Sequence, residues 1–398
     1  MIVVVVAGLY QLGDFRLYPY WNQAVSVSAA GFRIGLPLAA AVAAWEGTRL
    51  RRLHLDRRLA MQPPLAIVWP QLLPIVLAVA VGYGTVLSGS LGEVASLSGG
   101  FNGWILLSYF ATTLSAVLSG YILGFYFVAP VAIPVALILN YQWASFPLQD
   151  GSNLSWRHMS GYTLIDCCTT VYEQPAPVAL LAPLFMAAAL LFSVAVLFWT
   201  VRVWIRAVST LAAITVAALI AYILVSPLSA YPSEMRDPSA LVCKGNEPVV
   251  CIWPEQEEVE GASDRNALDS AFQSLVMAGH DIPSRIETRD DQSGATTAPP
   301  GMTWLYYTPG SGKTQLLANY AFSLLRDFSC HETDDPKMYI SELQTTQAWM
   351  LLTWGIRIDE IGSVVPQETI DKATVKMKQG TDEYERWLDE RGISSACK

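Results

Sequence analysis

Long apolar segments dominate the first 228 residues of the chain, whereas polar residues prevail in the rest. A bilayer core about 30 Å thick requires about 20 mostly apolar residues in one helix. Met1–Gly13 is apolar but too short to cross alone, so it either ends a longer helix or continues through Phe15 and Leu17. The pattern predicts a polytopic α-helical membrane bundle of six to seven transmembrane helices over residues 1–228. The six full-length spans are expected at Val25–Glu46, Leu65–Ser88, Gly103–Tyr126, Val128–Phe146, Val178–Thr200 and Ala207–Leu228.

In residues 229–398 the apolar residues form shorter patterns, which are typical of the strands and helices of a water-soluble domain. Glu247–Trp253 alternates like a strand, and Leu268–Val276 has apolar residues at helical spacing. Further helices are expected over Lys313–Arg326, Met338–Trp354 and Thr381–Glu390. A segment of this length can bury a core of its own. We therefore expect a C-terminal α+β domain over residues 229–398.

The arginines predict which way the helices cross the membrane. Arg49, Arg51, Arg52, Arg57 and Arg58 share one short connector, and Arg202 and Arg206 flank another. Positive charge in short connectors marks the cytoplasmic side. Four expected spans separate the two connectors, so both can be cytoplasmic at once. The C-terminal domain of a plasma-membrane protein is then extracytoplasmic.

Composition and charge agree with this division. Hydrophobic residues make up 53% of the 398 residues, more than a soluble globule usually contains. Ten Arg against seven acidic residues give +3 for residues 1–228, and 15 basic against 27 acidic residues give −12 for the remainder. An acidic soluble domain repels nucleic acid, which requires a basic face. We expect a lipid bilayer, and no nucleic acid, as a partner.

All six cysteines are expected on the outer side: Cys167, Cys168, Cys243, Cys251, Cys330 and Cys397. An even number on the oxidising side of the membrane indicates disulfides. Six cysteines allow 15 pairings, and the sequence does not choose among them. We expect Cys243 to pair with Cys251 across the turn Lys244-Gly245-Asn246. No CxxC pair or histidine partner stands at ligand spacing, so no metal is expected.

Residues 310–314, Gly-Ser-Gly-Lys-Thr, copy the end of a phosphate-binding loop between an expected strand at Thr303–Tyr307 and a helix. The full motif is G-x-x-x-x-G-K-[ST], and its first glycine permits the turn whose amides face the phosphates. Tyr307 occupies that position here, and Pro309 removes an amide donor. We interpret the segment as a Pro-Gly turn before an ordinary helix, and expect no nucleotide cofactor.

The expected spans after residue 64 contain no Asp, Glu or Lys. A proton- or sodium-coupled transporter usually carries such a group at the membrane midplane, so secondary transport is not favoured. Arg33 lies within the first span. It either contacts an anionic substrate or lipid headgroup, or extends to the outer headgroups. The connector that carries Arg49–Arg58 either binds a cytoplasmic partner or only determines topology. No nucleophile elbow, HExxH or other catalytic pattern is present, so we expect no enzymatic activity.

Several stretches resemble membrane proteins of actinobacteria that look like ABC-2-type permeases with an added extracytoplasmic domain. They are Ala44–Arg52, Ser119–Gly124 leading into Ala129-Pro130, Trp156–Gly161 with Cys167-Cys168, Arg236-Asp237-Pro238 with Cys243, and Val250–Glu255. The likeness covers most of residues 20–280. The outer-domain motif is Trp253-Pro254-Glu255. It is followed by Gln256 where the resemblance implies His, so no metal or acid–base role is carried over.

The resemblance implies a membrane subunit powered by a separate cytoplasmic ABC ATPase, with a second membrane subunit or a second copy of the chain as a further partner. The Arg49–Arg58 connector would be the coupling element. An alternative is a membrane-anchored sensor or immunity protein whose outer domain binds a ligand. A structural accessory subunit of a larger membrane assembly is a third interpretation.

Overall fold

A computed structural model of the chain describes residues 5–6, 20–52, 64–94, 100, 102–149, 155–168, 170–198, 202–228, 231–245, 248–277, 279, 282–288, 301–305, 312–326 and 336–379. The chain forms two compact units, unit 1 (Met1–Arg236) and unit 2 (Asp237–Lys398). The division lies a few residues beyond Leu228, because a strand at Ser233–Met235 pairs with unit 1. Apart from residues 5 and 6, Met1–Gly13 lies outside the described residues.

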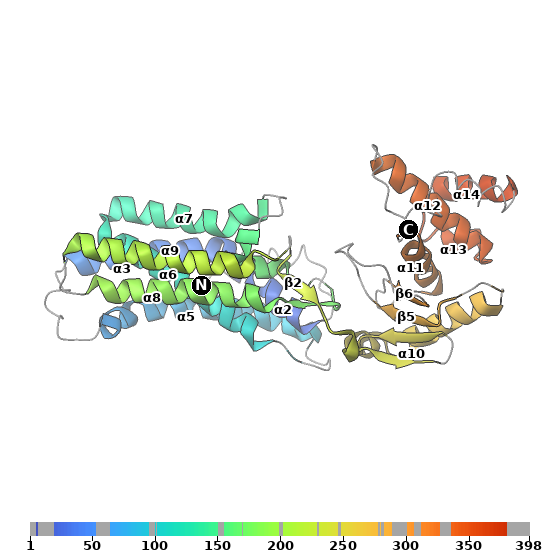
Figure 1. Cartoon of the computed structure of the whole chain (residues 1–398), viewed down its shortest axis with the longest axis horizontal. Helices are drawn as coiled ribbons and strands as arrows, with labels where there is room; N and C mark the ends of the chain where they lie inside the picture. The colour runs from blue at the N-terminus through green and yellow to red at the C-terminus, as the bar shows by residue number, and fades with distance from the viewer. Residues whose placement is uncertain are drawn as a thin grey trace. The chain divides into compact units, whose positions relative to one another are not determined.

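Unit 1 is a helical bundle (Figure 1). Its helices are α2 (Trp21–Val27), α3 (Phe32–Arg52), α5 (Pro64–Val94), α6 (Gly103–Tyr126), α7 (Ala129–Gln149), α8 (Pro177–Leu197) and α9 (Val203–Val225), with 3-10 turns η1 (Ser28–Gly31), η2 (Ser155–Ser160) and η3 (Tyr162–Asp166). The Asn102 side chain caps the start of α6 by accepting from the amide of Trp104. Pro177 begins α8 at a position where no amide donor is needed.

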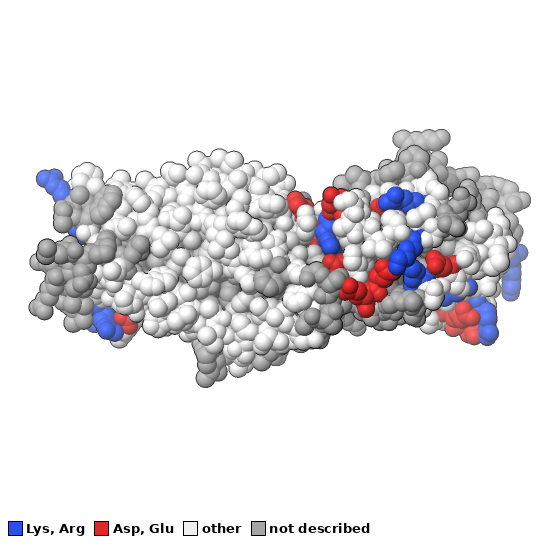
Figure 2. Space-filling view, turned by 90° about the horizontal axis from the view of Figure 1, so that it is seen from below, with Lys and Arg blue, Asp and Glu red and all other residues white. Residues whose placement is uncertain are grey.

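Within the described residues, five helical stretches are long and apolar enough to cross a membrane: Trp21–Arg52, Ala66–Gly92, Gly103–Tyr126, Pro177–Leu197 and Val203–Val225. Each coincides with an expected span. The sixth expected span, Val128–Phe146, corresponds to the helix α7, which is not among these five stretches and contains Asn140 and Gln142. In Figure 2, the described residues on the flank of unit 1 carry no charged side chains over most of its length.

The centre of unit 1 is the contact between α3 and α6, where small residues allow the two backbones to meet. A Cβ added at Gly120 would collide with the backbone of Ala40, and one added at Gly124 would collide with the backbone of Ala44. The Thr48 hydroxyl donates to the Gly124 carbonyl (3.1 Å). The helix α7 packs on the same helix pair, whereas α9 packs mainly on α8.

Both arginine-bearing connectors lie at one end of the bundle, which we call the arginine end. Arg51, near the end of α3, donates to the carbonyl of Tyr126, the last residue of α6 (2.9 Å). The ring of Phe125 lies 6.3 Å from that of Phe198, which follows α8. Arg206 of α9 donates to the carbonyl of the last residue of α8 (2.9 Å). Four helices, α5 to α8, connect the two sites, and α5, α6 and α8 are among the stretches long and apolar enough to cross a membrane.

The opposite end, which we call the cysteine end, carries η2, η3 and Cys167-Cys168. Two short strands pair there, β1 (Glu173–Pro175) and β2 (Ser233–Met235). The Tyr20 hydroxyl donates to the Glu173 carbonyl (3.0 Å), and the Arg236 amide donates to the Tyr172 carbonyl (2.9 Å). The chain therefore leaves unit 1 at the cysteine end.

Unit 2 contains a four-stranded sheet in the order β3-β4-β5-β6, packed with helices (Figure 1). Three strands are parallel neighbours, and β3 is an antiparallel edge. Its elements are η4 (Pro238–Ala240), β3 (Val242–Lys244), β4 (Val249–Ile252), α10 (Pro254–Met277), β5 (Arg285–Thr288), β6 (Met302–Leu305), α11 (Lys313–Arg326), α12 (Pro336–Thr353), α13 (Ile358–Ile361) and α14 (Gln367–Gln379). The expected helix Lys313–Arg326 is confirmed in full, while Thr381–Glu390 lies outside the described residues.

Candidate functional site

A cavity of about 340 Å³ lies among the helices of unit 1. Residues spaced along one face of α6 form its floor, α7 forms one wall, and α8 with α9 forms the other. Its lining residues include Thr112, Ser115, Ala116, Ser119 and Leu123 of α6, Leu139, Asn140, Trp143 and Ala144 of α7, Pro183, Met186 and Leu190 of α8, and Ile214 of α9. This volume is within the range of small-molecule sites.

Polar groups on α6 and α7 meet inside this otherwise apolar cavity. The Asn140 amide donates to Ser119 Oγ (3.2 Å) and to the carbonyl of Ala136 (2.9 Å). Ser115 lies one helical turn from Ser119 on the same face, and its buried Oγ has no hydrogen-bond partner in the described part of the chain. A polar group in an apolar environment is costly when it lacks a partner. We call Ser115, Ser119 and Asn140 the polar seam, and it can hydrogen-bond a ligand.

The turns η2 and η3 cover the cavity at the cysteine end, where Ser160 and Tyr162 join its lining. Thr112 Oγ1 donates to the Ser160 carbonyl (3.3 Å), which fixes this cap on α6. Gly161 has a positive φ of 69°, and a Cβ there would collide with Thr112 and Pro183. Only glycine fits this position.

The polar residues of the cap serve its structure. Arg157 is 9% exposed and pairs with Asp166 (3.3 Å). Burial raises the pKa of Asp166, and the positive charge of Arg157 opposes that rise. The His158 ring nitrogen Nδ1 lies 3.1 Å from Thr163 Oγ1. The stretch Trp156–Gly161 is therefore the lid of the cavity at this end.

Arg33 lies beside the same end of the cavity. It precedes the lining residue Leu36 by three positions on α3, so the two share a helix face. Its Nε donates to Ser145 Oγ (3.3 Å), adjacent to the lining residue Ala144. Among the described residues no carboxylate forms an ion pair with Arg33. The structure thus leaves a partly buried cation next to residues that line one end of the cavity.

The arginines of the first connector have different surroundings. Arg51 binds the carbonyls that end α6, so it is committed to holding two helices together. Arg49 pairs with Glu46 (3.2 Å) but its side chain stays 62% exposed, and Arg52 is exposed as well. These two are available for a partner, whereas Arg57 and Arg58 lie outside the described residues.

Two disulfides are present among the described residues, Cys167–Cys168 and Cys243–Cys251. The Cys243–Cys251 pairing agrees with the expectation from sequence, because β3 and β4 place the two residues opposite each other. Both cysteines of the other pair are fully buried at the cysteine end, and Cys168 has a positive φ of 61°. Cys330 and Cys397 lie outside the described residues.

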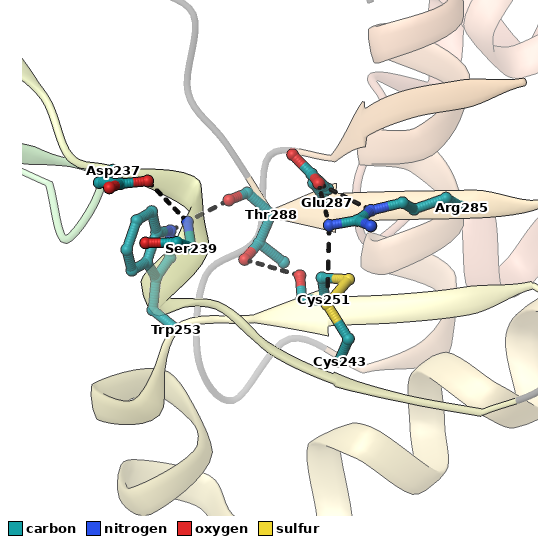
Figure 3. A network of polar contacts seen from close by, with 8 residues as sticks. All are labelled: Asp237, Ser239, Cys243, Cys251, Trp253, Arg285, Glu287 and Thr288. Atoms are coloured by element: carbon teal, nitrogen blue, oxygen red, sulfur yellow. Dashed lines mark hydrogen bonds and ion pairs between the residues drawn. A yellow bond between two sulfur atoms is a disulfide. The ribbon is translucent and has the colours of Figure 1, made fainter. Parts of the chain in front are cut away.

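The motif Trp253-Pro254-Glu255 lies at the carboxyl end of β4 and begins α10 (Figure 3). The Trp253 indole donates to the carbonyl of Thr288 on β5 (3.1 Å). The Gln256 side chain accepts from the Trp253 amide (3.1 Å) and from the Thr288 hydroxyl (3.0 Å), which is half of a capping box. Glu255 is buried beside it. The motif fastens helix α10 to two strands, and Gln256 is a structural residue.

A second set of polar contacts surrounds the Cys243–Cys251 disulfide (Figure 3). Arg285 pairs with the buried Glu287 (2.7 Å), and its guanidinium lies 3.9 Å from Cys243 Sγ. Thr288 donates to the Cys251 carbonyl (3.3 Å). Within the described residues, no three His, Cys, Asp or Glu side chains gather as metal ligands would.

The glycine-lysine-threonine segment does follow a strand and begin a helix, since β6 precedes it and α11 starts at Lys313. Residues 306–311, which include Tyr307 and Pro309, lie outside the described part of the chain. The Lys313 side chain is exposed, and the Thr314 hydroxyl donates to Glu360 (3.3 Å).

Unit 1 and its cavity define a multi-pass helical protein suited to a membrane, with an added domain built on a small sheet. Residues 250–394 match a family described as a domain of unknown function, DUF7224. No curated protein and no solved structure matches the chain. The resemblance to ABC-2-type permeases remains a prediction.

Proposed function

We propose that this chain is the membrane, permease-like subunit of an ATP-driven transport complex whose energy comes from a separate cytoplasmic ATPase. The observation that carries the proposal is the cavity of about 340 Å³ among α3, α6, α7, α8 and α9. A bundle that only anchors a soluble domain gains stability from filling such a space, since interiors otherwise pack densely. Within the polar seam, Ser115 Oγ supports a binding role, because a partnerless polar group in an apolar environment is costly.

The lining of the cavity supports an energy source outside this chain. Its described lining residues carry hydroxyl, amide and apolar side chains, without a carboxylate that would bind a coupling ion. At the arginine end, Arg49 and Arg52 form an exposed basic surface. We infer that this surface faces the cytoplasm and receives the ATPase, and that unit 2 is extracytoplasmic.

Purification from native membranes in mild detergent tests the partner. We expect an ATPase subunit to copurify with the wild-type chain and the yield to fall about tenfold or more in an Arg49→Glu, Arg52→Glu variant, because the changes reverse the charge of the docking surface. Arg357→Glu is the matched control, since this arginine of unit 2 is 73% exposed. A wild-type chain repeatedly recovered alone would contradict the proposal and favour an anchored sensor.

Labelling of whole cells tests the orientation. Cys243 is exposed once its disulfide is reduced. After treatment with a membrane-impermeant reductant, an impermeant maleimide should label Cys243 in intact cells, and Cys243→Ser should lose that signal. A cysteine introduced at Val203, which is 68% exposed at the arginine end, should react only after lysis. The reverse pattern would place unit 2 in the cytoplasm.

A further inference from the structure

We propose that the cavity of unit 1 binds a single-chain anionic amphiphile, with its acidic head at Arg33 and its chain among α6, α7 and α8. This inference rests on the proposed function, since it names the class of molecule that the transport subunit would carry. Carboxylate and phosphate heads share the relevant chemistry, because both accept charge-assisted hydrogen bonds from a guanidinium.

The head position follows from the surroundings of Arg33. Its only hydrogen-bond acceptor among the described side chains is the neutral hydroxyl of Ser145 (3.3 Å), and no described carboxylate pairs with it. A guanidinium has five donors, so most of them remain available. Charges within a membrane protein are usually paired or functional. An anion at this point would supply the missing countercharge, whereas a cationic ligand would be repelled.

The position of the ligand's hydrocarbon chain follows from the shape and chemistry of the cavity. Leu36 places the start of the lining one turn from Arg33, and the α6 residues Thr112 to Leu123 extend the lining along the helix axis. At 1.5 Å per residue, this floor is about 17 Å long, which is the length scale of a lipid chain rather than of a compact solute. The volume of about 340 Å³ leaves room for one hydrocarbon chain.

The route into the cavity opens toward lipid. Leu139 and Trp143 of α7 line the cavity and are 54% and 39% exposed. Among the described residues no extensive contact joins α7 to α8 or α9, so the two walls are separate there. In a bilayer this opening faces acyl chains, and an amphiphile can enter without crossing water.

Binding of cis-parinaric acid to the purified full chain in a non-ionic detergent tests the inference. Its fluorescence should rise on binding, and parinaryl alcohol, which has the same chain and no charge, should bind about tenfold more weakly, a difference of about 1.4 kcal/mol. Arg33→Gln should weaken the acid about tenfold and leave the alcohol unchanged. Arg33→Lys should retain part of the preference, and Arg202→Gln, which changes an exposed arginine at the arginine end, should change neither.

Two further arms identify the tail. Ala116→Leu, which fills the floor, should weaken acid and alcohol alike. Oleate and a lysophosphatidylglycerol should displace the probe, whereas diacyl phosphatidylglycerol should not. Equal affinity of the wild-type chain for acid and alcohol, or no binding of either, overturns the inference without the need for a variant. Since these measurements use the isolated chain, they are independent of whether an ATPase copurifies, which tests the proposed function itself.

Discussion

Replacing Gly124 with valine should prevent α3 and α6 from packing and remove most of the folded protein from the membrane. The added Cβ would meet the backbone of Ala44, which has no flexible end that can move aside. Overpacking a core costs about 1–3 kcal/mol even where side chains can adjust, and here a helix must shift. Size-exclusion profiles of detergent extracts should show loss of the monodisperse peak. Any protein that remains folded should have a lowered melting temperature.

The chain offers a matched control for this substitution. Gly84 is also within a helix long and apolar enough to cross a membrane, α5, and a Cβ added there meets no atom within 4 Å. Gly84→Val should leave yield and melting temperature close to wild type. Gly120→Val, which collides with Ala40, should reproduce the defect of Gly124→Val. If Gly124→Val behaved like Gly84→Val, the close approach of α3 and α6 would be wrong.

Replacing Trp253 with alanine should destabilise unit 2 by about 3–5 kcal/mol, the usual cost of removing a large buried aromatic side chain. The side chain is 2% exposed and its indole donates to Thr288 on the neighbouring strand, so both packing and a hydrogen bond are lost. Amide hydrogen exchange, read by mass spectrometry, should accelerate at least a hundredfold in β4, β5 and the start of α10.

Exchange in unit 1 should stay unchanged in the same sample, which supplies an internal reference. Phe322→Ala is the control variant, because Phe322 is an aromatic residue of α11 that is 39% exposed. Gln256→Ala should give a smaller effect of about 1 kcal/mol, since it removes the cap of α10 while leaving the aromatic packing intact. Unaltered protection in Trp253→Ala would show that the motif does not hold α10 to the sheet.

The elements that could be predicted from the sequence are those with long, regular patterns of apolar residues. The membrane-spanning helices and α11 follow directly from apolar runs or stripes of full helical length. The Cys243–Cys251 pair was predictable because a turn glycine separates two short apolar stretches, and Gly245 does have a positive φ of 97°. In each of these cases the information is local in the chain.

Other features depend on contacts between distant residues, which no local pattern contains. The pairing of β1 with β2 joins residues about 60 positions apart, in strands of three residues each. The order of the strands in the unit 2 sheet could not be predicted from the sequence either, and the same holds for the short strand β5. The cavity was not foreseen, although Asn140 within an apolar run was a usable signal, since a polar side chain there needs a partner on another helix.

The residue that ends unit 1, Arg236, is bound to the segment that precedes β1 at the cysteine end. The Arg236 side chain donates to the carbonyl of Val171 (2.8 Å), its amide donates to Tyr172, and its guanidinium lies 5.3 Å from the Tyr20 ring. Val171 follows the disulfide turn that completes η3 within a few residues. A displacement of this segment would therefore be transmitted through Arg236 to Asp237, the first residue of unit 2 in the chain.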